Sequence, residues 1–230
     1  MEQLLLPVSV SEHMVFESFY PGPNLEIYQS LQANVQKSLW VAGKQSSGKT
    51  HLLQAAFHRC IRLSKSSLYI PMREFEQFSP EILDDLDQLH LICIDDIEFV
   101  LGKQIWERNL LDLYERIQTT DTHLVIASHV PPKGIDFFLP DLASRFSMSV
   151  IHQLEMLSEI EILSAIQMHA EVRGFNLPNE SANYLIKRVE RNVGSLIDII
   201  NILDYESLSK QRKLTIPFIK NILNLNYKDQ

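Results

Sequence analysis

Apolar and polar positions follow two different patterns along this chain of 230 residues. Between Leu39 and about Ile151, short apolar runs typical of strands alternate with longer stretches in which apolar residues recur at helical spacing. This alternation predicts βαβ units around a parallel sheet, rather than a β-sandwich or a helical bundle. From Ser158 onward, helical spacing continues without strand-like runs. We therefore predict an α/β domain followed by a small all-helical domain.

The first half of the chain is expected to supply every strand. The predicted strands are Ser38–Val41, Ser67–Ile70, His90–Ile94, His123–Ala127 and Val150–Ile151. The predicted helices of this half are Thr50–Leu63, Pro80–Leu89, Gly102–Thr120 and Asp141–Arg145. Pro71 and the pair Pro131-Pro132 mark turns after two of the strands.

The second half begins with a sequence typical of a helix N-terminus. Ser158 is followed three positions later by Glu161, a capping-box pattern, and this helix is expected to run to the stop at Gly174. The further predicted helices are Asn179–Arg191, Ser195–Ser209 and Ile216–Leu223. The expected domains are thus an N-terminal tail of residues 1–13, an α/β domain of residues 14–155 and a helical lid domain of residues 156–230.

Residues 43–50 match the phosphate-loop pattern G-x-x-x-x-G-K-[ST] and lie between a predicted strand and a predicted helix. Glycines let the backbone N–H groups approach phosphate oxygens at the positive end of the helix, while Lys49 supplies a charge for the β and γ phosphates. The alternative is an ordinary glycine-rich turn, which the four filled positions disfavour. We expect ADP or ATP to be the cofactor. The candidate nucleotide-binding residues are Gly43, Lys44, Gln45, Ser46, Ser47, Gly48, Lys49, Thr50 and His51.

An apolar run at residues 90–94 ends in the carboxylates of Asp95 and Asp96. Ligands of open α/β sheets bind at the carboxyl ends of the strands, so these side chains are expected beside the phosphate loop. Asp95 is the candidate Mg²⁺ ligand together with Thr50, and Asp96 is the candidate catalytic residue that orients or deprotonates an attacking water. A strand followed by an acidic turn is also common without function. Its combination with the phosphate loop favours the catalytic interpretation.

Composition limits the other function classes. A hydrophobic content of 45% is ordinary for a globular protein, and the net charge of −8 argues against a broad phosphate-binding surface for nucleic acid. The two cysteines and eight histidines show no convincing metal-ligand spacing. The apolar patch Leu4–Leu6 is too short for a signal peptide or a membrane span. We therefore expect a cytoplasmic protein without membrane contact.

Three further segments carry a resemblance to the AAA+ module of the DnaA/Hda family of bacterial replication proteins, over roughly residues 14–225. They are Phe16–Asn24, Asp141–Phe146 and Asn192–Leu196. The resemblance implies that Arg145 is an arginine finger, a second catalytic residue that reaches a neighbouring molecule's triphosphate. It also implies that the adenine site is bordered by Phe19 and Tyr20.

The N-terminal residues resemble the short Q-L-x-L-P-[LV] peptides that dock on the bacterial DNA polymerase sliding clamp, its beta subunit. An extended tail that ends in proline loses little entropy on ordering, and its leucines can fill an apolar pocket. The alternative is a tail or edge strand without a partner. The candidate clamp-binding residues are Gln3, Leu4, Leu6, Pro7 and Val8.

The resemblance implies a regulator that docks on DnaA and, with the clamp, stimulates hydrolysis of DnaA-bound ATP. No DNA-reading element is recognised, so direct sequence-specific DNA binding is not expected. Gly194 stands where the family has its sensor II arginine, although Arg188 or Arg191 could substitute, and His129 stands at the sensor I position. Both departures favour slow or absent self-catalysed hydrolysis. The alternatives are an autonomous ATPase or helicase loader and a nucleotide-stabilised scaffold on the clamp; a homo-oligomer is compatible with each.

Overall fold

The computed structural model of the protein describes residues 10–33, 36–189, 193–210 and 212–226, and the chain divides into two compact units. The first, here called the sheet unit, comprises residues up to Phe16 and residues Asn24–Glu155. The second, the helical unit, combines Glu17–Pro23 with the residues from Met156 onward. A short N-terminal segment therefore belongs to the unit that is otherwise formed by the end of the chain.

A parallel sheet forms the centre of the sheet unit, which confirms the predicted α/β class. Its strands are β1 Ser38–Ala42, β2 Ser67–Pro71, β3 Leu91–Asp95, β4 His123–Ser128 and β5 Val150–Gln153. The spatial order is β2-β3-β4-β1-β5, and Leu39 in β1 lies opposite both Val125 and Val150. Every residue of β1 and of β3 is buried, because helices cover both faces.

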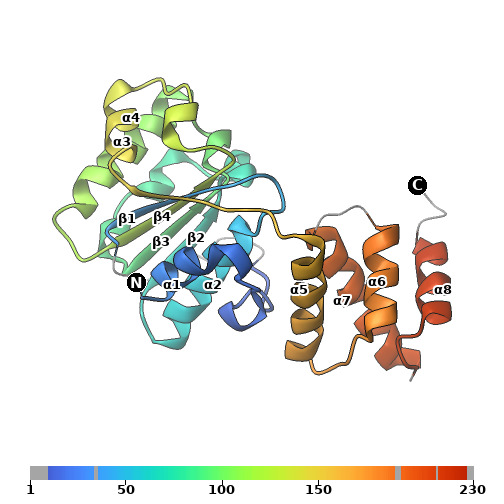
Figure 1. Cartoon of the computed structure of the whole chain (residues 1–230). Helices are drawn as coiled ribbons and strands as arrows, with labels where there is room; N and C mark the ends of the chain where they lie inside the picture. The colour runs from blue at the N-terminus through green and yellow to red at the C-terminus, as the bar shows by residue number, and fades with distance from the viewer. Residues whose placement is uncertain (1–9, 34–35, 190–192, 211, 227–230) are drawn as a thin grey trace. The chain divides into compact units, whose positions relative to one another are not determined.

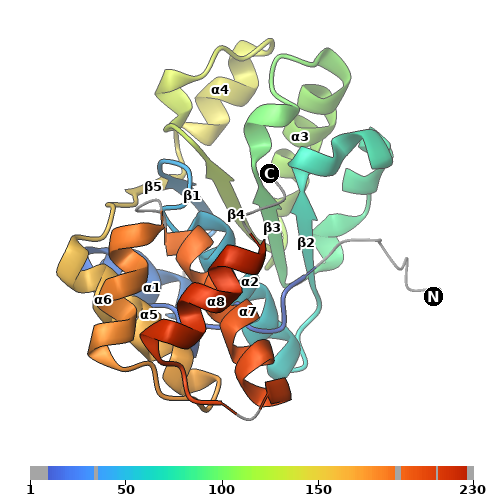
Figure 2. The same ribbon diagram turned by 90° about the vertical axis from the view of Figure 1, so that its right-hand side faces the viewer.

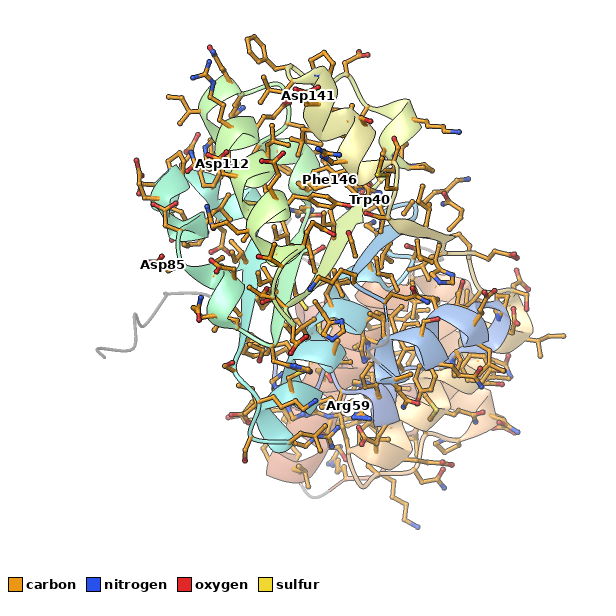
Figure 3. All side chains as sticks on the ribbon, turned by 90° about the vertical axis from the view of Figure 1, so that its left-hand side faces the viewer. Trp40, Arg59, Asp85, Asp112, Asp141 and Phe146 are labelled. Atoms are coloured by element: carbon orange, nitrogen blue, oxygen red, sulfur yellow. The ribbon has the colours of Figure 1, made fainter. Side chains whose placement is uncertain are left out.

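Figures 1 and 2 show α1 and α2 on one face of the sheet and α3 and α4 on the other. The helices of this unit are α1 Leu25–Ala33, α2 Lys49–Arg62, α3 Gln104–Ile117 and α4 Pro140–Phe146. Aromatic residues join α4 to the sheet. The ring of Phe146 lies 5.4 Å from that of Trp40 in β1, and both side chains are fully buried (Figure 3).

The predicted helix Pro80–Leu89 is wrong. This stretch forms two separate 3₁₀ turns, η4 Pro80–Leu83 and η5 Leu86–Gln88, with Asp85 in a left-handed conformation between them (φ 57°). The backbone carbonyls make tertiary bonds instead of helical ones: Arg116 Nη2 donates to Leu83 O (2.7 Å) and Thr122 Oγ1 donates to Asp87 O (2.7 Å). The other 3₁₀ segments are η1 Phe16–Ser18, η2 Gly22–Asn24, η3 Met72–Gln77, η6 Ile97–Phe99 and η7 Pro132–Gly134.

The helical unit contains α5 Glu159–Val172, α6 Asn179–Arg188, α7 Val193–Lys210 and α8 Ile216–Asn226. The predicted capping box is present, since the Ser158 hydroxyl accepts from Glu161 N and the Glu161 carboxylate accepts from Ser158 N. An ion pair of 2.9 Å joins Arg173 to Asp204 beside the apolar core of the unit. The helix predicted to extend to Arg191 ends at Arg188, because the backbone of Val189 is extended.

Candidate functional site

The predicted phosphate loop connects the carboxyl end of β1 to the N-terminus of α2. Its backbone is left-handed at Ser46 (φ 61°) and Gly48 (φ 99°). A Cβ atom on Gly43 would lie 2.5 Å from Ser47 Oγ and 3.0 Å from Leu154 Cβ, so a larger residue does not fit without a shift of the loop. Successive N–H groups in such a turn, placed before a helix, form a concave surface that suits an anion.

Lys49 is the first residue of α2, and its side chain folds back over the loop. It is only 5% exposed, and its Nζ donates to the carbonyls of Gly43 (2.7 Å) and Lys44 (3.0 Å). Burial lowers the pKa of Lys49, and the charge of Asp95 opposes this shift. A bound phosphate would favour the charged amine in the same way. The side chains of Lys44 and Gln45 are exposed to solvent. We therefore expect these two residues to contact a phosphate through their backbone N–H groups.

Asp95 ends β3 and is 2% exposed. Its carboxylate is hydrogen-bonded to the Thr50 hydroxyl, and it accepts from Tyr69 Oη (2.8 Å) and from the backbone N–H of Asp96 (3.0 Å). Burial raises the pKa of Asp95, and the neighbouring charge of Asp96 adds to the shift. The structure thus brings Thr50 and Asp95 into contact, while their role as Mg²⁺ ligands stays a prediction.

Two buried side chains that were not predicted as site residues form a hydrogen-bond network with Asp95. Tyr69 in β2 and Gln54 in α2 are each 4% exposed and hydrogen-bonded to each other. The Gln54 amide oxygen also accepts from Ser11 N (3.0 Å), which ties the segment before α1 to this network. Gln54 could have been recognised from the sequence, because it is a polar residue among the apolar positions of its helix. Tyr69 could not, because its partner Asp95 lies in another strand far along the sequence.

The residues present fit a nucleotide phosphate and a hard cation. Ser47 Oγ is buried in the loop and has no hydrogen-bond partner among the described residues. The oxygens of Thr50 and Asp95 are ligands that Mg²⁺ accepts, and Mg²⁺ usually completes its shell with phosphate oxygens and water. In the described part of the chain, no cluster of three or more His, Cys, Asp or Glu side chains could hold a metal ion alone. A metal ion at Thr50 and Asp95 would therefore depend on the nucleotide.

Asp96 follows β3 with a left-handed backbone (φ 52°). Its Oδ2 lies 3.1 Å from Nε of Arg73, whose guanidinium also lies over the ring of Phe99, 5.6 Å from its centroid. The Arg73 side chain is 59% exposed, so this ion pair is open to water and weak. Any role for Asp96 in orienting water must compete with this pair.

The carboxyl end of β4 leads into His129, the residue predicted at the sensor I position. Ser128 is fully buried, accepts from Trp40 Nε1 (2.8 Å) and donates to Val130 O. His129 is exposed, and its Nδ1 contacts the Glu98 carboxylate. The Ser128 hydroxyl is therefore used in holding the sheet together. The group exposed at this end of the strand is the imidazole of His129, next to the Glu98 carboxylate.

The remaining candidate nucleotide contacts lie in different surroundings. His51 in α2 places Nε2 3.0 Å from Val15 O, so its ring faces the N-terminal segment. Phe19 and Tyr20 belong to Glu17–Pro23 of the helical unit, where Phe19 is 7% exposed. Contacts of these three residues with a nucleotide stay predictions.

Arg145 lies in the last turn of α4, flanked in the same helix by the fully buried Leu142 and Phe146. Its own side chain is 46% exposed, and Nη2 lies 3.6 Å from Glu115 Oε1 in α3. The structure therefore presents a half-exposed guanidinium on a helix whose opposite side is anchored in the core. Such a group can reach another molecule after leaving one weak ion pair.

Several predicted residues lie outside the described residues. They are Gln3, Leu4, Leu6, Pro7 and Val8 of the clamp-binding peptide, and Arg191. Gly194, at the predicted sensor II position, lies in the first turn of α7, and the Arg188 guanidinium lies over the ring of Tyr184, 5.6 Å from its centroid.

Two sequence-family models match the chain. The bacterial DnaA ATPase domain matches residues 10–153, and the lid domain of Hda matches residues 159–223. The fold is similar to domain III of the replication initiation protein DnaA from Thermotoga maritima, with a TM-score of 0.76, 22% identity, and coverage of 96% of this chain and 98% of that one. It is also similar to AMPPCP-bound DnaA from Aquifex aeolicus, with a TM-score of 0.72, 20% identity, and coverage of 89% of this chain and 70% of that one.

A more distant likeness is to the RuvB Holliday junction branch migration motor of Thermotoga maritima, with a TM-score of 0.66 and 16% identity. It covers 91% of this chain and 73% of the RuvB chain. A phosphate loop on a parallel sheet, followed by a small helical unit, defines a P-loop protein of the AAA+ class. Within that class the chain belongs to the bacterial DnaA ATPase-domain family, and its lid makes it a DnaA/Hda-related AAA+ protein.

This confirms the family and the fold class expected from the sequence. A bilayer-spanning helix is not found in the described part of the chain, because each helix there is too short or too polar for one.

Proposed function

We propose that this protein is an AAA+ adaptor that stimulates hydrolysis of DnaA-bound ATP and thereby negatively regulates initiation of DNA replication. Support comes from the combination of a DnaA-type ATPase domain with an Hda-type lid. The proposal makes DnaA its protein partner and the DNA-loaded sliding clamp its second partner. Gln3–Val8 is the proposed clamp-binding segment.

The adaptor binds ADP or ATP at residues 43–50, where the backbone N–H groups and Lys49 hold the phosphates. Thr50 and Asp95 hold Mg²⁺, which neutralises phosphate charge when bound. Ser47 Oγ, which is buried and finds no hydrogen-bond partner within the described part of the chain, supports this assignment, as does the close approach at Gly43. Gly194 stands at the sensor II position and His129 at the sensor I position, so the adaptor's own turnover is expected well below about 1 s⁻¹, an ordinary enzyme rate.

The proposal rests above all on the half-exposed guanidinium of Arg145 in the last turn of α4. A guanidinium on an anchored helix can enter another molecule's catalytic centre and neutralise charge that develops on the γ-phosphate as its bond breaks. An arginine supplied in this way accelerates hydrolysis by about 10³–10⁵-fold in GTPase systems. One exposed side chain is therefore sufficient for a large effect, provided that its helix is held in place.

The test is a reconstituted assay of DnaA-bound ATP with DNA-loaded clamp and the full chain. Arg145→Ala is expected to lower the stimulated rate by about 10³-fold while clamp binding persists. Arg59→Ala is the matched control, because it removes a guanidinium from the last turn of α2, and Figure 3 shows Arg59 far from Phe146 at the end of α4. Equal stimulation by the wild type and Arg145→Ala would exclude this function.

The contact between Thr50 and Asp95 beside Lys49 favours a second candidate, an autonomous ATPase. A clamp pull-down with Gln3→Ala and Leu6→Ala separates the two, because an autonomous ATPase predicts no dependence on these residues. A scaffold on the clamp would also lose clamp binding in the Gln3→Ala and Leu6→Ala variants. It makes no use of Arg145, so Arg145→Ala would leave the rate of hydrolysis of DnaA-bound ATP unchanged.

A further inference from the structure

Glu107 is a fully buried carboxylate on the far side of α3 from solvent. It lies in the first turn of the helix and is 0% exposed. Oε1 accepts the backbone N–H groups of Gly102 (2.6 Å) and Phe138 (3.0 Å), and Oε2 accepts that of Leu139 (2.7 Å). An ionised carboxylate is costly to bury unless it is hydrogen-bonded, and these three donors meet that need.

Two of the three donors immediately precede α4. Pro140 opens that helix and has no N–H of its own, and Glu107 accepts the amides of the two residues before it, Phe138 and the N-cap residue Leu139. At the other end, Phe146 packs against Trp40 and against Tyr114, whose ring lies 5.8 Å away. The short helix is thus fixed at its start by one side chain and at its end by aromatic packing.

We propose that Glu107 is the positioning residue for Arg145. It never contacts the reacting phosphate; it fixes where α4 begins and therefore where the guanidinium in its last turn is presented. This inference depends on the proposed function, in which Arg145 acts on ATP bound to DnaA. Displacing a catalytic group by about 1 Å can cost about 100-fold in rate, so a loosened helix start has a large effect without unfolding the unit.

Glu107→Gln is the informative change. The amide keeps the volume of the side chain, and its oxygen can retain the two bonds made by Oε1, but its NH₂ group then faces the N–H of Leu139. In the reconstituted assay we expect the maximal stimulated rate to fall about 10–100-fold, with little change in the adaptor concentration that gives half-maximal stimulation. Hydrogen exchange of residues 138–146 in the full chain should become faster. Ile70→Val in β2 is the matched control, because Ile70 belongs to the same buried core as Phe146 but lies in the edge strand that β3 and β4 separate from β1.

The double variant with Arg145→Ala separates positioning from general destabilisation. If Glu107 acts through Arg145, Glu107→Gln causes no further loss in the Arg145→Ala background. The proposal would be overturned if Glu107→Gln lowered the stimulated rate by the same factor with and without Arg145→Ala. It would also be overturned if Glu107→Gln stimulated hydrolysis as well as the wild type while Arg145→Ala was inactive. If Arg145→Ala is itself fully active, the proposed function fails, and the positioning role fails with it.

Discussion

Asp95 and Glu107 are two almost completely buried carboxylates of the sheet unit, and each accepts three hydrogen bonds. Asp95 receives two from the side-chain hydroxyls of Thr50 and Tyr69 and one from a backbone amide. Glu107 receives all three from backbone amides. Hydroxyl groups can rotate toward another acceptor, whereas a backbone amide moves only with the chain. The same number of bonds therefore has different consequences at the two sites.

The environment of Asp95 suits a carboxylate that exchanges partners. Burial and the charge of Asp96 raise its pKa despite the hydrogen bonds, so its ionised form gains from a nearby cation. The environment of Glu107 suits a carboxylate that fixes a loop to a helix. The comparison teaches that burial alone does not distinguish a carboxylate suited to a cation from one that holds the fold together; the mobility of the groups that donate to it does.

Of the effects that bear on this comparison, the largest is expected at the phosphate loop beside Asp95, with Glu107 left intact. Lys49→Ala should weaken ADP binding about 100-fold, because a hydrogen bond to a charged group contributes about 1.5–3 kcal/mol and 1.4 kcal/mol is a factor of ten. Calorimetric titration measures it, with Glu107→Gln as the control that should bind within about twofold of the wild type. Binding of ADP by Lys49→Ala within threefold of the wild type would contradict this account of the loop.

A smaller effect concerns stability. Because the pKa of Asp95 is raised, its contribution to folding is largest in acid and is lost as the pH rises through that raised pKa. Asp95→Asn should therefore stabilise the nucleotide-free and metal-free chain at about pH 7, by about 2–4 °C in Tm if the gain is near 1 kcal/mol. Scanning calorimetry should show this gain shrinking toward about pH 4. A lower Tm for the variant at neutral pH would mean that the hydrogen bonds outweigh the buried charge.

The smallest effect concerns the ion pair that holds Arg145 in the free protein. Both side chains are about half exposed and their atoms are 3.6 Å apart, so the pair contributes at most about 1 kcal/mol. Glu115→Gln should raise the rate of stimulated hydrolysis about twofold by releasing Arg145, and the gain should disappear in high salt. A loss of stimulation in this variant would instead show that Glu115 helps to aim the guanidinium.

Features that depend on local pattern could be predicted from the sequence. The uninterrupted apolar residues of β1 and β3 gave both buried strands, and Ser158 with Glu161 gave the start of α5. The phosphate loop carries its conformation in its own glycines. These features are encoded within a few residues of each other, so no long-range contact had to be known.

Features set by distant contacts could not be predicted. Residues 80–89 have apolar positions compatible with a helix, but Arg116 and Thr122 take two of their carbonyls. Glu107 has no distinguishing feature in the sequence, because its acceptor role depends on amides more than thirty positions later. Both cases depend on hydrogen bonds between segments that only the fold brings together.

The sheet order also constrains how the protein is made. β1 is the first strand along the chain, yet its two neighbours, β4 and β5, are the last two. A ribosome adding about 5–20 residues per second therefore needs several seconds between finishing β1 and delivering both flanking strands. Until residues 150–153 have emerged, the strand that leads into the phosphate loop has an unpaired edge. Nascent chains stalled before that point would expose the backbone N–H and C=O groups along this edge of β1, which β5 pairs in the finished protein.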